Sequence, residues 1–245
     1  MNFTGRVALI TGAAVGIGRA TALEMARMGA SLILLDLNSE KLAALKEELA
    51  QYTDNVQIFA CDISNEESVN EAVAESMKNV GKIDILVNNA GIWRDRGSFL
   101  EVSTAEWKKY FDINVMGTVY VTRAVLPSML ENGYGRIINV ASVAGVYGNA
   151  KMTQYSATKG ALISFTKALA KETSANGVLV NAVSPGSVSP SGELDIDYTQ
   201  PSELSFMGRT GSGRENADLI CFLASEEAGY ISGQNIQIDG CRKKQ

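Results

Sequence analysis

The chain has 245 residues, of which 46% are hydrophobic and 20% charged, and its formal net charge is −5. It contains no histidine, which excludes a Ser-His-Asp triad, a Cys-His pair, a histidine general base and a histidine metal ligand. Its three cysteines form no C-x-x-C pair, so a cysteine-rich zinc site is excluded and we expect no metal. Scattered cysteines also argue against a disulfide framework and favour a reducing compartment.

The negative net charge limits the classes of partner that we expect. No basic run precedes the extreme C-terminus, so we expect no nucleic-acid partner, because phosphate binding needs clustered lysine or arginine. The N-terminus lacks the pattern of a signal peptide, and the longest apolar runs are too short to span a bilayer. We therefore predict a cytoplasmic protein without a membrane partner.

Seven short apolar segments alternate with longer segments of helical period. They are Val7–Thr11, Leu32–Asp36, Val56–Cys61, Ile83–Val87, Arg136–Val140, Val178–Val183 and Asn235–Ile238. Most are continuous apolar runs, typical of parallel strands that are covered on both faces. The alternation predicts an α/β Rossmann fold, a doubly wound seven-stranded parallel sheet flanked by helices on both faces. Because no linker or repeat is visible, we expect one domain spanning residues 1–245.

Helix boundaries have local signals as well. The Ser-x-x-Glu pattern of a capping box begins at Ser64, Ser103 and Ser212. Pro127 is expected to kink or end a helix that begins near Thr104. One irregular stretch, 187–203, is too long for a simple turn, and we interpret it as a substrate lid extending to residue 207; a passive insertion is the alternative.

A glycine-rich turn, TGAAVGIG at residues 11–18, directly follows the first strand and opens the first helix. Glycines there permit a tight turn and a close approach of the backbone to a pyrophosphate, while the helix N-terminus offers free N–H groups. We predict a dinucleotide site formed by Gly12, Val15, Gly16, Ile17 and Gly18.

Asp36 ends the second strand, eighteen residues after Gly18. A carboxylate there accepts hydrogen bonds from the adenosine ribose and repels a 2′-phosphate. Neither Val15 nor Leu37 supplies a cation that would bind such a phosphate, so the sequence favours NAD over NADP. Asp62, with Ile63 beside it, is expected at the adenine; a helix N-terminal cap is the alternative interpretation of Asp62.

Tyr155 and Lys159 are spaced i, i+4 and share one face of a predicted helix. Tyrosine is a poor base at neutral pH, but a neighbouring ammonium and a cationic nicotinamide stabilise its phenolate. This pair therefore offers acid–base chemistry to a protein without histidine.

Together with Asn88-Asn89-Ala90-Gly91, Asn114, Ser142 and Pro185-Gly186, these motifs resemble the short-chain dehydrogenase/reductase family over essentially the whole chain. The resemblance implies that Tyr155 is the general acid/base, that Ser142 holds the substrate oxygen, and that Lys159 binds the nicotinamide ribose and lowers the tyrosine pKa. It implies that Asn114 interrupts its helix and holds a water that links Lys159 to solvent. It further places Asn88, Ala90 and Gly91 along the cofactor cleft, and Pro185, Gly186 and the Val188 backbone at the nicotinamide. Ser142 as a strand-end turn residue and Asn114 as a helix-bending residue are the structural alternatives.

Within the family, the pattern is most similar to the 3-oxoacyl-carrier-protein reductase branch. That branch generally uses NADPH, which Asp36 opposes, and presents basic residues to its acidic carrier protein where this chain has Glu131 and Ala175. Cys241 replaces a glycine that is common in the family, in a segment that often lies at a subunit interface. The resemblance implies a homotetramer, with a dimer as the alternative.

We therefore predict an NAD-dependent oxidoreductase of a secondary alcohol or ketone, such as a steroid, polyol, sugar or cyclic alcohol. The alternatives are an NADPH-linked 3-oxoacyl-(acyl-carrier-protein) reductase and a dinucleotide-sensing protein without turnover. We expect substrate contacts near Trp93–Arg96, Val143–Asn149, Met152 and the lid. Arg94 and Arg96 are candidates for binding an acid, but the adjacent Asp95 makes a solvated loop the alternative.

Overall fold

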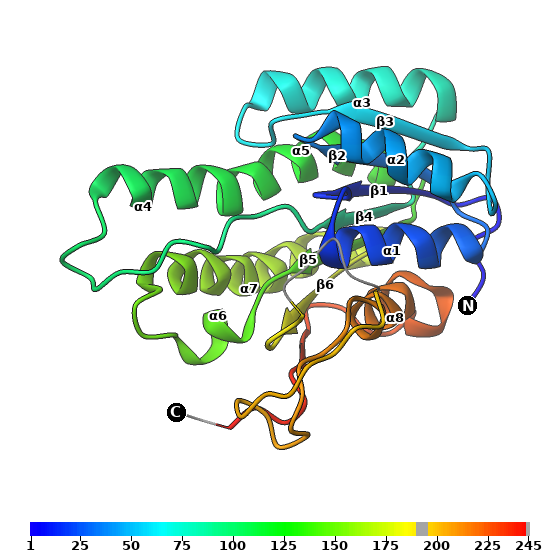
Figure 1. The fold of residues 1–245 in the computed structure, drawn as a ribbon. Coiled ribbons are helices and arrows are strands. Elements are labelled where there is room, and N and C mark those ends of the chain that lie inside the picture. Colours follow the sequence, from blue (N-terminus) through cyan, green and yellow to red (C-terminus); the bar gives the residue numbers. More distant parts are fainter. Residues whose placement is uncertain (190–195, 244–245) are drawn as a thin grey trace.

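A parallel sheet forms the centre of the computed structural model, which describes residues 1–189 and 196–243. In these residues seven strands lie in the order β3-β2-β1-β4-β5-β6-β7, and every neighbouring pair is parallel (Figure 1). The strands are β1 Val7–Thr11, β2 Ser31–Asp36, β3 Val56–Ala60, β4 Ile85–Asn88, β5 Gly135–Val140, β6 Val178–Pro185 and β7 Asn235–Ile238. The predicted Rossmann fold is confirmed, and the strand ends agree with the predicted ends to within two residues.

Helices cover both faces of this sheet. The α-helices are α1 Gly16–Arg27, α2 Ser39–Leu49, α3 Glu66–Val80, α4 Thr104–Phe111, α5 Gly117–Glu131, α6 Val143–Tyr147, α7 Thr153–Thr173 and α8 Gly213–Ala224. Apolar side chains of α1, α2 and α8 pack in one core on one face of the sheet. Those of α3, α5 and the end of α7 form the second core on the other face. None of the helices in the described residues is long and apolar enough to cross a membrane.

Two of the three predicted capping boxes are present. Ser103 and Ser212 each accept a hydrogen bond from the backbone of the glutamate three residues on, which bonds back to the serine N–H. The prediction at Ser64 is wrong: α3 begins at Glu66, and the Asn65 side chain caps it. The Ser64 hydroxyl instead donates to Asp62 Oδ1 at 2.7 Å, because asparagine satisfies the same backbone donors from one residue closer to the helix.

Pro127 does not end its helix, since α5 continues through it to Glu131. The interruption lies earlier, where a π-helical turn, Asp112–Met116, joins α4 to α5. Residues 190–195 of the predicted lid, Leu194 among them, lie outside the described residues.

A close contact between α6 and α7 depends on Gly145. A Cβ atom there would lie 2.5 Å from the Lys159 carbonyl carbon and 2.6 Å from the Gly160 nitrogen. Both atoms belong to the backbone of α7 and cannot rotate away. Any side chain at position 145 therefore separates the helix after β5 from the helix that carries Tyr155 and Lys159.

We predict that Gly145→Ala lowers the free energy of unfolding by about 1–3 kcal/mol, as overpacking does elsewhere. Gly160→Ala is the matched control on the facing helix, because a Cβ there meets its nearest neighbour at an ordinary 3.5 Å. Alanine also favours the helix interior by about 1 kcal/mol over glycine, so this variant should be neutral or more stable. Chemical denaturation compares the two variants, and equal stabilities would contradict the close contact.

Candidate active site

Most of the predicted site residues follow the carboxyl ends of β1 to β6, which lie at one edge of this parallel sheet (Figure 1). The Thr11 hydroxyl accepts hydrogen bonds from the backbone N–H groups of Asn89 at 3.0 Å and Ala90 at 3.1 Å. The Asn89 amide donates to the carbonyl oxygens of Thr11 and Gly12 at 3.0 and 2.9 Å. These bonds join the glycine-rich turn after β1 to the segment after β4.

Glycines in the turn meet two different requirements. A Cβ at Gly18 would lie 2.2 Å from the Gly12 carbonyl oxygen, so Gly18 permits the turn to pack against the start of α1. Gly16 has a φ of +58° and nothing within 4 Å of a Cβ position. The space beside Gly16 therefore admits a ligand close to the backbone.

The start of α1 carries no side-chain cap and no acidic residue in its first turn. Five other helices, α2, α3, α4, α6 and α8, begin with a capping side chain, whereas α5 and α7 do not. Uncapped N–H groups at the positive end of a helix form an anion site. Together with the open space at Gly16, this arrangement fits the pyrophosphate of a dinucleotide.

Asp36 lies beside this turn, at the end of β2. Its Oδ2 accepts from the Ala14 N–H at 3.0 Å, and its Oδ1 from the Asn38 N–H at 3.0 Å. Its neighbours Val15 and Leu37 are exposed, and neither carries charge. The nearby Arg19 guanidinium donates twice to Glu48 of α2, at 2.8 and 2.6 Å. Carboxylates thus dominate the charge at this end of the site.

Three predicted cofactor residues also make contacts within the fold. Asp62 Oδ1 accepts from both the N–H and the hydroxyl of Ser64, but Asp62 is not the cap of α3, because Asn65 occupies that position. Ile63 is buried against Gly117, where a Cβ would meet its Cδ1 at 2.6 Å. The Asn88 amide nitrogen donates to Asn139 and Thr122 in the interior. The Asn88 side chain therefore links β4 to β5 and α5, and the cofactor roles of these three residues stay predictions.

Asn114 lies in the π-helical turn and is fully buried. Its Oδ1 accepts from the Ile92 N–H at 2.8 Å, and its Nδ2 donates to the Ile92 carbonyl at 3.0 Å and the Thr158 hydroxyl at 3.1 Å. A Cβ at Gly91 would lie 3.0 Å from Asn114 Oδ1 and 3.5 Å from Lys159 Nζ. Asn114 thus holds the segment after β4 against the helix that carries Tyr155 and Lys159.

Lys159 is buried, and its Nζ donates to the Val140 carbonyl at the end of β5 at 2.7 Å. Burial away from water lowers the pKa of this ammonium to about 8. The Nζ lies 5.8 Å from the centroid of the Tyr155 ring.

The Tyr155 pKa is raised above its ordinary value, chiefly because burial disfavours the phenolate, and a hydrogen bond from Ser142 opposes that effect. The Ser142 side chain also caps α6 by accepting from the Ala144 N–H at 3.1 Å. Without cofactor, burial therefore outweighs the hydrogen bond from Ser142 and favours the protonated phenol, and the lowering of its pKa by Lys159 stays a prediction.

The turn after β6 holds the remaining predicted residues. A Cβ at Gly186 would lie 2.8 Å from Asp239, so glycine permits close packing on the segment after β7. Val188 pairs in parallel with Gly211 through the backbone of Ser187 and Ser189. Because a strand alternates its bonding edges, the Val188 N–H and carbonyl face away from that partner.

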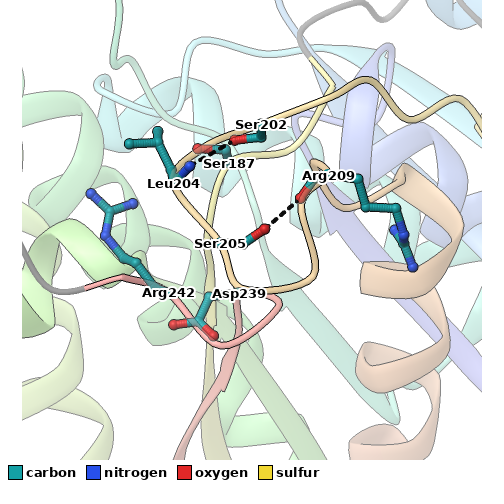
Figure 2. A pocket seen from close by; sticks show the side chains of 7 residues that line it. All are labelled: Ser187, Ser202, Leu204, Ser205, Arg209, Asp239 and Arg242. Atoms are coloured by element: carbon teal, nitrogen blue, oxygen red, sulfur yellow. Dashed lines mark hydrogen bonds between the residues drawn. The ribbon is translucent and has the colours of Figure 1, made fainter.

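A small polar pocket opens beside this turn, lined by Ser187, Ser202, Leu204, Ser205, Arg209, Asp239 and Arg242. In Figure 2 the Arg209 guanidinium points away from Asp239 and Arg242, and it pairs with Glu215 at 2.6 Å. Cys241, next to the pocket, has a φ of +57°, a left-handed conformation that explains why glycine suits this position.

Sequence reasoning missed a group of contacts that hold the segment after β4. The Tyr110 hydroxyl accepts from the Asp95 N–H at 3.1 Å and donates to Asp95 Oδ2 at 3.3 Å. The Gln154 amide, one residue before Tyr155, donates to the Asp95 carbonyl at 3.2 Å. Tyr110 and Gln154 are both fully buried. The spacing of these three residues along the chain carries no local signal that they meet.

In the described residues no group of three or more histidine, cysteine, aspartate or glutamate side chains is arranged to hold a metal ion.

The buried ammonium predicts a dependence of stability on pH. The unfolded chain keeps the Lys159 proton up to its ordinary pKa of 10.5, whereas the folded protein releases it at about 8. Between these values the unfolded state binds more protons, so the contribution of Lys159 to the free energy of unfolding rises with pH, by up to about 3 kcal/mol.

Urea titrations of the cofactor-free protein at pH 7.5 and pH 10, with Lys159→Met as the reference, measure this effect. The wild type should gain stability relative to the variant at the higher pH. A difference that does not change with pH would show that Lys159 titrates normally.

Comparison with known proteins agrees with this geometry. Residues 6–197 match the family model described as short chain dehydrogenase. A 3-oxoacyl-[acyl-carrier-protein] reductase of Thermotoga maritima is 39% identical over 98% of each chain. A 2-dehydro-3-deoxy-L-rhamnonate dehydrogenase (NAD(+)) of a Sphingomonas species is 38% identical over 98% of this chain and 96% of its own. The crystal structure of an NAD+-bound xylitol dehydrogenase has a TM-score of 0.91 and 31% identity, covering 98% of this chain and all of the other.

Proposed function

This chain belongs to the short-chain dehydrogenase family, and from that premise we propose that it transfers a hydride between NAD and a secondary alcohol or ketone, with Tyr155 as general acid/base. It is an oxidoreductase with a fold that binds a nicotinamide cofactor. The observation that carries the proposal is that Ser142, Tyr155 and Lys159 meet, and that the segment after β4 joins them to the glycine-rich turn: Gly91 adjoins Lys159, and Asn89 bonds to Gly12.

The preference for NAD is supported by the charge around Asp36. A 2′-phosphate would face this carboxylate, while Arg19, the basic residue of the first turn of α1, is already paired with Glu48. Two similar proteins carry NAD in their names, the rhamnonate dehydrogenase and the NAD+-bound xylitol dehydrogenase.

Each side chain of the site has a separate role in the reaction. Tyr155 exchanges a proton with the substrate oxygen, and Ser142, which already bonds to the phenol, orients that oxygen. When bound, the oxidised nicotinamide supplies the hydride acceptor and a positive charge that favours the phenolate. Lys159 holds the ribose hydroxyls and keeps its own charge below pH 8. Asn114 fixes the position of Gly91 and the following segment beside Lys159.

We predict that the wild type has a higher kcat/KM with NAD than with NADP. Asp36→Asn combined with Leu37→Arg should move the ratio of the two values toward NADP by roughly 10- to 100-fold, because it removes a repulsion and adds a charged hydrogen bond. Asparagine keeps an acceptor for the Ala14 N–H, so the turn is preserved. Initial-rate titration of both cofactors measures the ratio, and Leu37→Ala is the control.

A wild type that prefers NADPH would overturn the assignment of Asp36. It would favour the second candidate, a 3-oxoacyl-carrier-protein reductase, which is the name of relatives from Thermotoga maritima and Aquifex aeolicus at 39% and 41% identity.

We predict that Tyr155→Phe lowers kcat by roughly 100-fold or more, because it removes the general acid/base, while the dissociation constant of NADH stays unchanged. Tyr52→Phe, at an exposed tyrosine on the other side of the sheet, is the control. The wild-type oxidation rate should rise with pH without an inflection near pH 6.5, where an imidazole would titrate. Full turnover in Tyr155→Phe with the same pH profile would refute the role of Tyr155 and favour a sensing protein without turnover.

Assembly as a homotetramer and a cytoplasmic location stay predictions from the family resemblance and the composition.

A further inference from the structure

The segment after β4 lies along the first turns of α7, where Tyr155 is located. Gly91 adjoins Lys159 at one end, and the Gly97 N–H donates to the Lys151 carbonyl at 3.1 Å at the other. Between them, the Gln154 amide holds the Asp95 carbonyl. Residues 94–96 therefore stand directly beside the residue that precedes Tyr155.

Cations gather along this segment. Arg94, Arg96 and Lys151 are all exposed, and in the described part of the chain none of them forms an ion pair. We call these three residues the basic rim. It is a local excess of positive charge in a protein whose net charge is −5.

The two acids of the segment are engaged with other groups. Asp95 bonds to the buried Tyr110 through its carboxylate and its N–H. Glu101 accepts from the Ser98 N–H at 2.7 Å, and hydrogen bonds from the Ser98 side chain and backbone hold the pKa of Glu101 below its ordinary value. The sequence left a solvated loop around Asp95 as the alternative, and in the structure the Asp95 carboxylate accepts a hydrogen bond from Tyr110 of α4. The guanidinium groups therefore remain available to a ligand.

Arg242 adds positive charge nearby. Its Nη2 donates to the Asn149 side chain at 3.0 Å, and the Asn149 N–H donates to the hydroxyl of Ser156, next to Tyr155. Two hydrogen bonds therefore connect Arg242 to Ser156, the residue after Tyr155.

We propose that the basic rim binds a carboxylate of the substrate, so that the preferred substrates are hydroxy acids and the corresponding keto acids. This inference rests on the proposed dehydrogenase activity and names its substrate class. A planar guanidinium matches a carboxylate through two parallel hydrogen bonds, and two arginines and a lysine within three residues of the Gln154 contact suit a small anion. The carboxylate itself does not react: the carbinol carbon loses a hydride to oxidised cofactor, and its hydroxyl proton goes to Tyr155.

The test compares hydroxy acids of three to six carbons with their neutral amides, using NAD and following the absorbance of NADH. The wild type should give a higher kcat/KM for the acid of each pair. Arg94→Gln combined with Arg96→Gln should raise KM for the acid roughly 10- to 100-fold, as the loss of charged hydrogen bonds predicts, while KM for the amide and the dissociation constant of NADH stay unchanged.

Arg123→Gln combined with Lys78→Gln is the matched control, because it also removes two positive charges, from α5 and α3, where Arg123 pairs with Glu66 and Lys78 with Glu75. Equal KM changes in this control and in the Arg94/Arg96 double variant would reduce the effect to net charge and overturn the inference. A phosphorylated alcohol is tested as a further substrate. A higher kcat/KM for the phosphorylated alcohol than for the hydroxy acid would overturn the assignment of a carboxylate.

A binding experiment tests the inference even if the protein shows no turnover. Malonate titrated into the protein with NADH, followed by cofactor fluorescence, should bind the wild type at least about tenfold more tightly than the double variant, and more weakly as salt is added. If neutral alcohols are oxidised while the double variant changes neither KM nor malonate binding, this inference fails and the proposed function stands. If no alcohol reacts with either cofactor, the proposed function fails, and malonate binding alone decides the inference.

Discussion

The arrangement of the site depends on one buried ammonium. Lys159 Nζ lies in the interior at the end of β5 and donates to the Val140 carbonyl, and burial lowers its pKa to about 8. Burying a charge in such a place costs free energy of folding, because water is excluded and a carbonyl dipole compensates only partly. The surrounding elements approach it through backbone: Gly91 from the segment after β4, and Gly145 from α6. A side chain at position 145 would displace the helix of Lys159, and one at position 91 would press on Asn114 Oδ1 beside the lysine.

The same constraint explains the irregular turn between α4 and α5. The Asn114 side chain lies in this π-helical turn, and its amide bonds from there to Ile92 and Thr158. Such turns occur often at functional sites. Asn114 thus ties together three segments around Lys159, and Asn88, Asn139, Thr122 and Thr166 continue the buried hydrogen bonding behind it.

Features with a local cause could be predicted from the sequence. Apolar runs located all seven strands, and Ser-x-x-Glu located the starts of α4 and α8. The prediction at Ser64 was wrong because Asn65 competes for the same donors, a choice that the pattern alone does not resolve. Three features were not predictable: the close contact at Gly145, the burial of the Asn88 amide and the contacts of Asp95. Each joins residues that are distant in sequence, and no periodic pattern in the sequence indicates that they meet. The contacts of Asp95 changed the interpretation most, since the sequence left a solvated loop as the alternative and the fold ties Asp95 to Tyr110 and Gln154.

The absence of histidine links the tyrosine to the basic rim. With no imidazole in the chain, the proton is assigned to a phenol whose pKa is raised by burial. A substrate carboxylate placed next to that phenol would raise the pKa further, because like charges disfavour the phenolate. Arginines that bind the carboxylate offset this repulsion, because their positive charge compensates the negative charge of the carboxylate. In a hydroxy-acid dehydrogenase built on this chain, the basic rim would therefore serve the proton transfer as well as the affinity for the substrate. Loss of the basic rim would move the pH profile for oxidation of the acid to higher pH and leave the pH profile for a neutral alcohol unchanged.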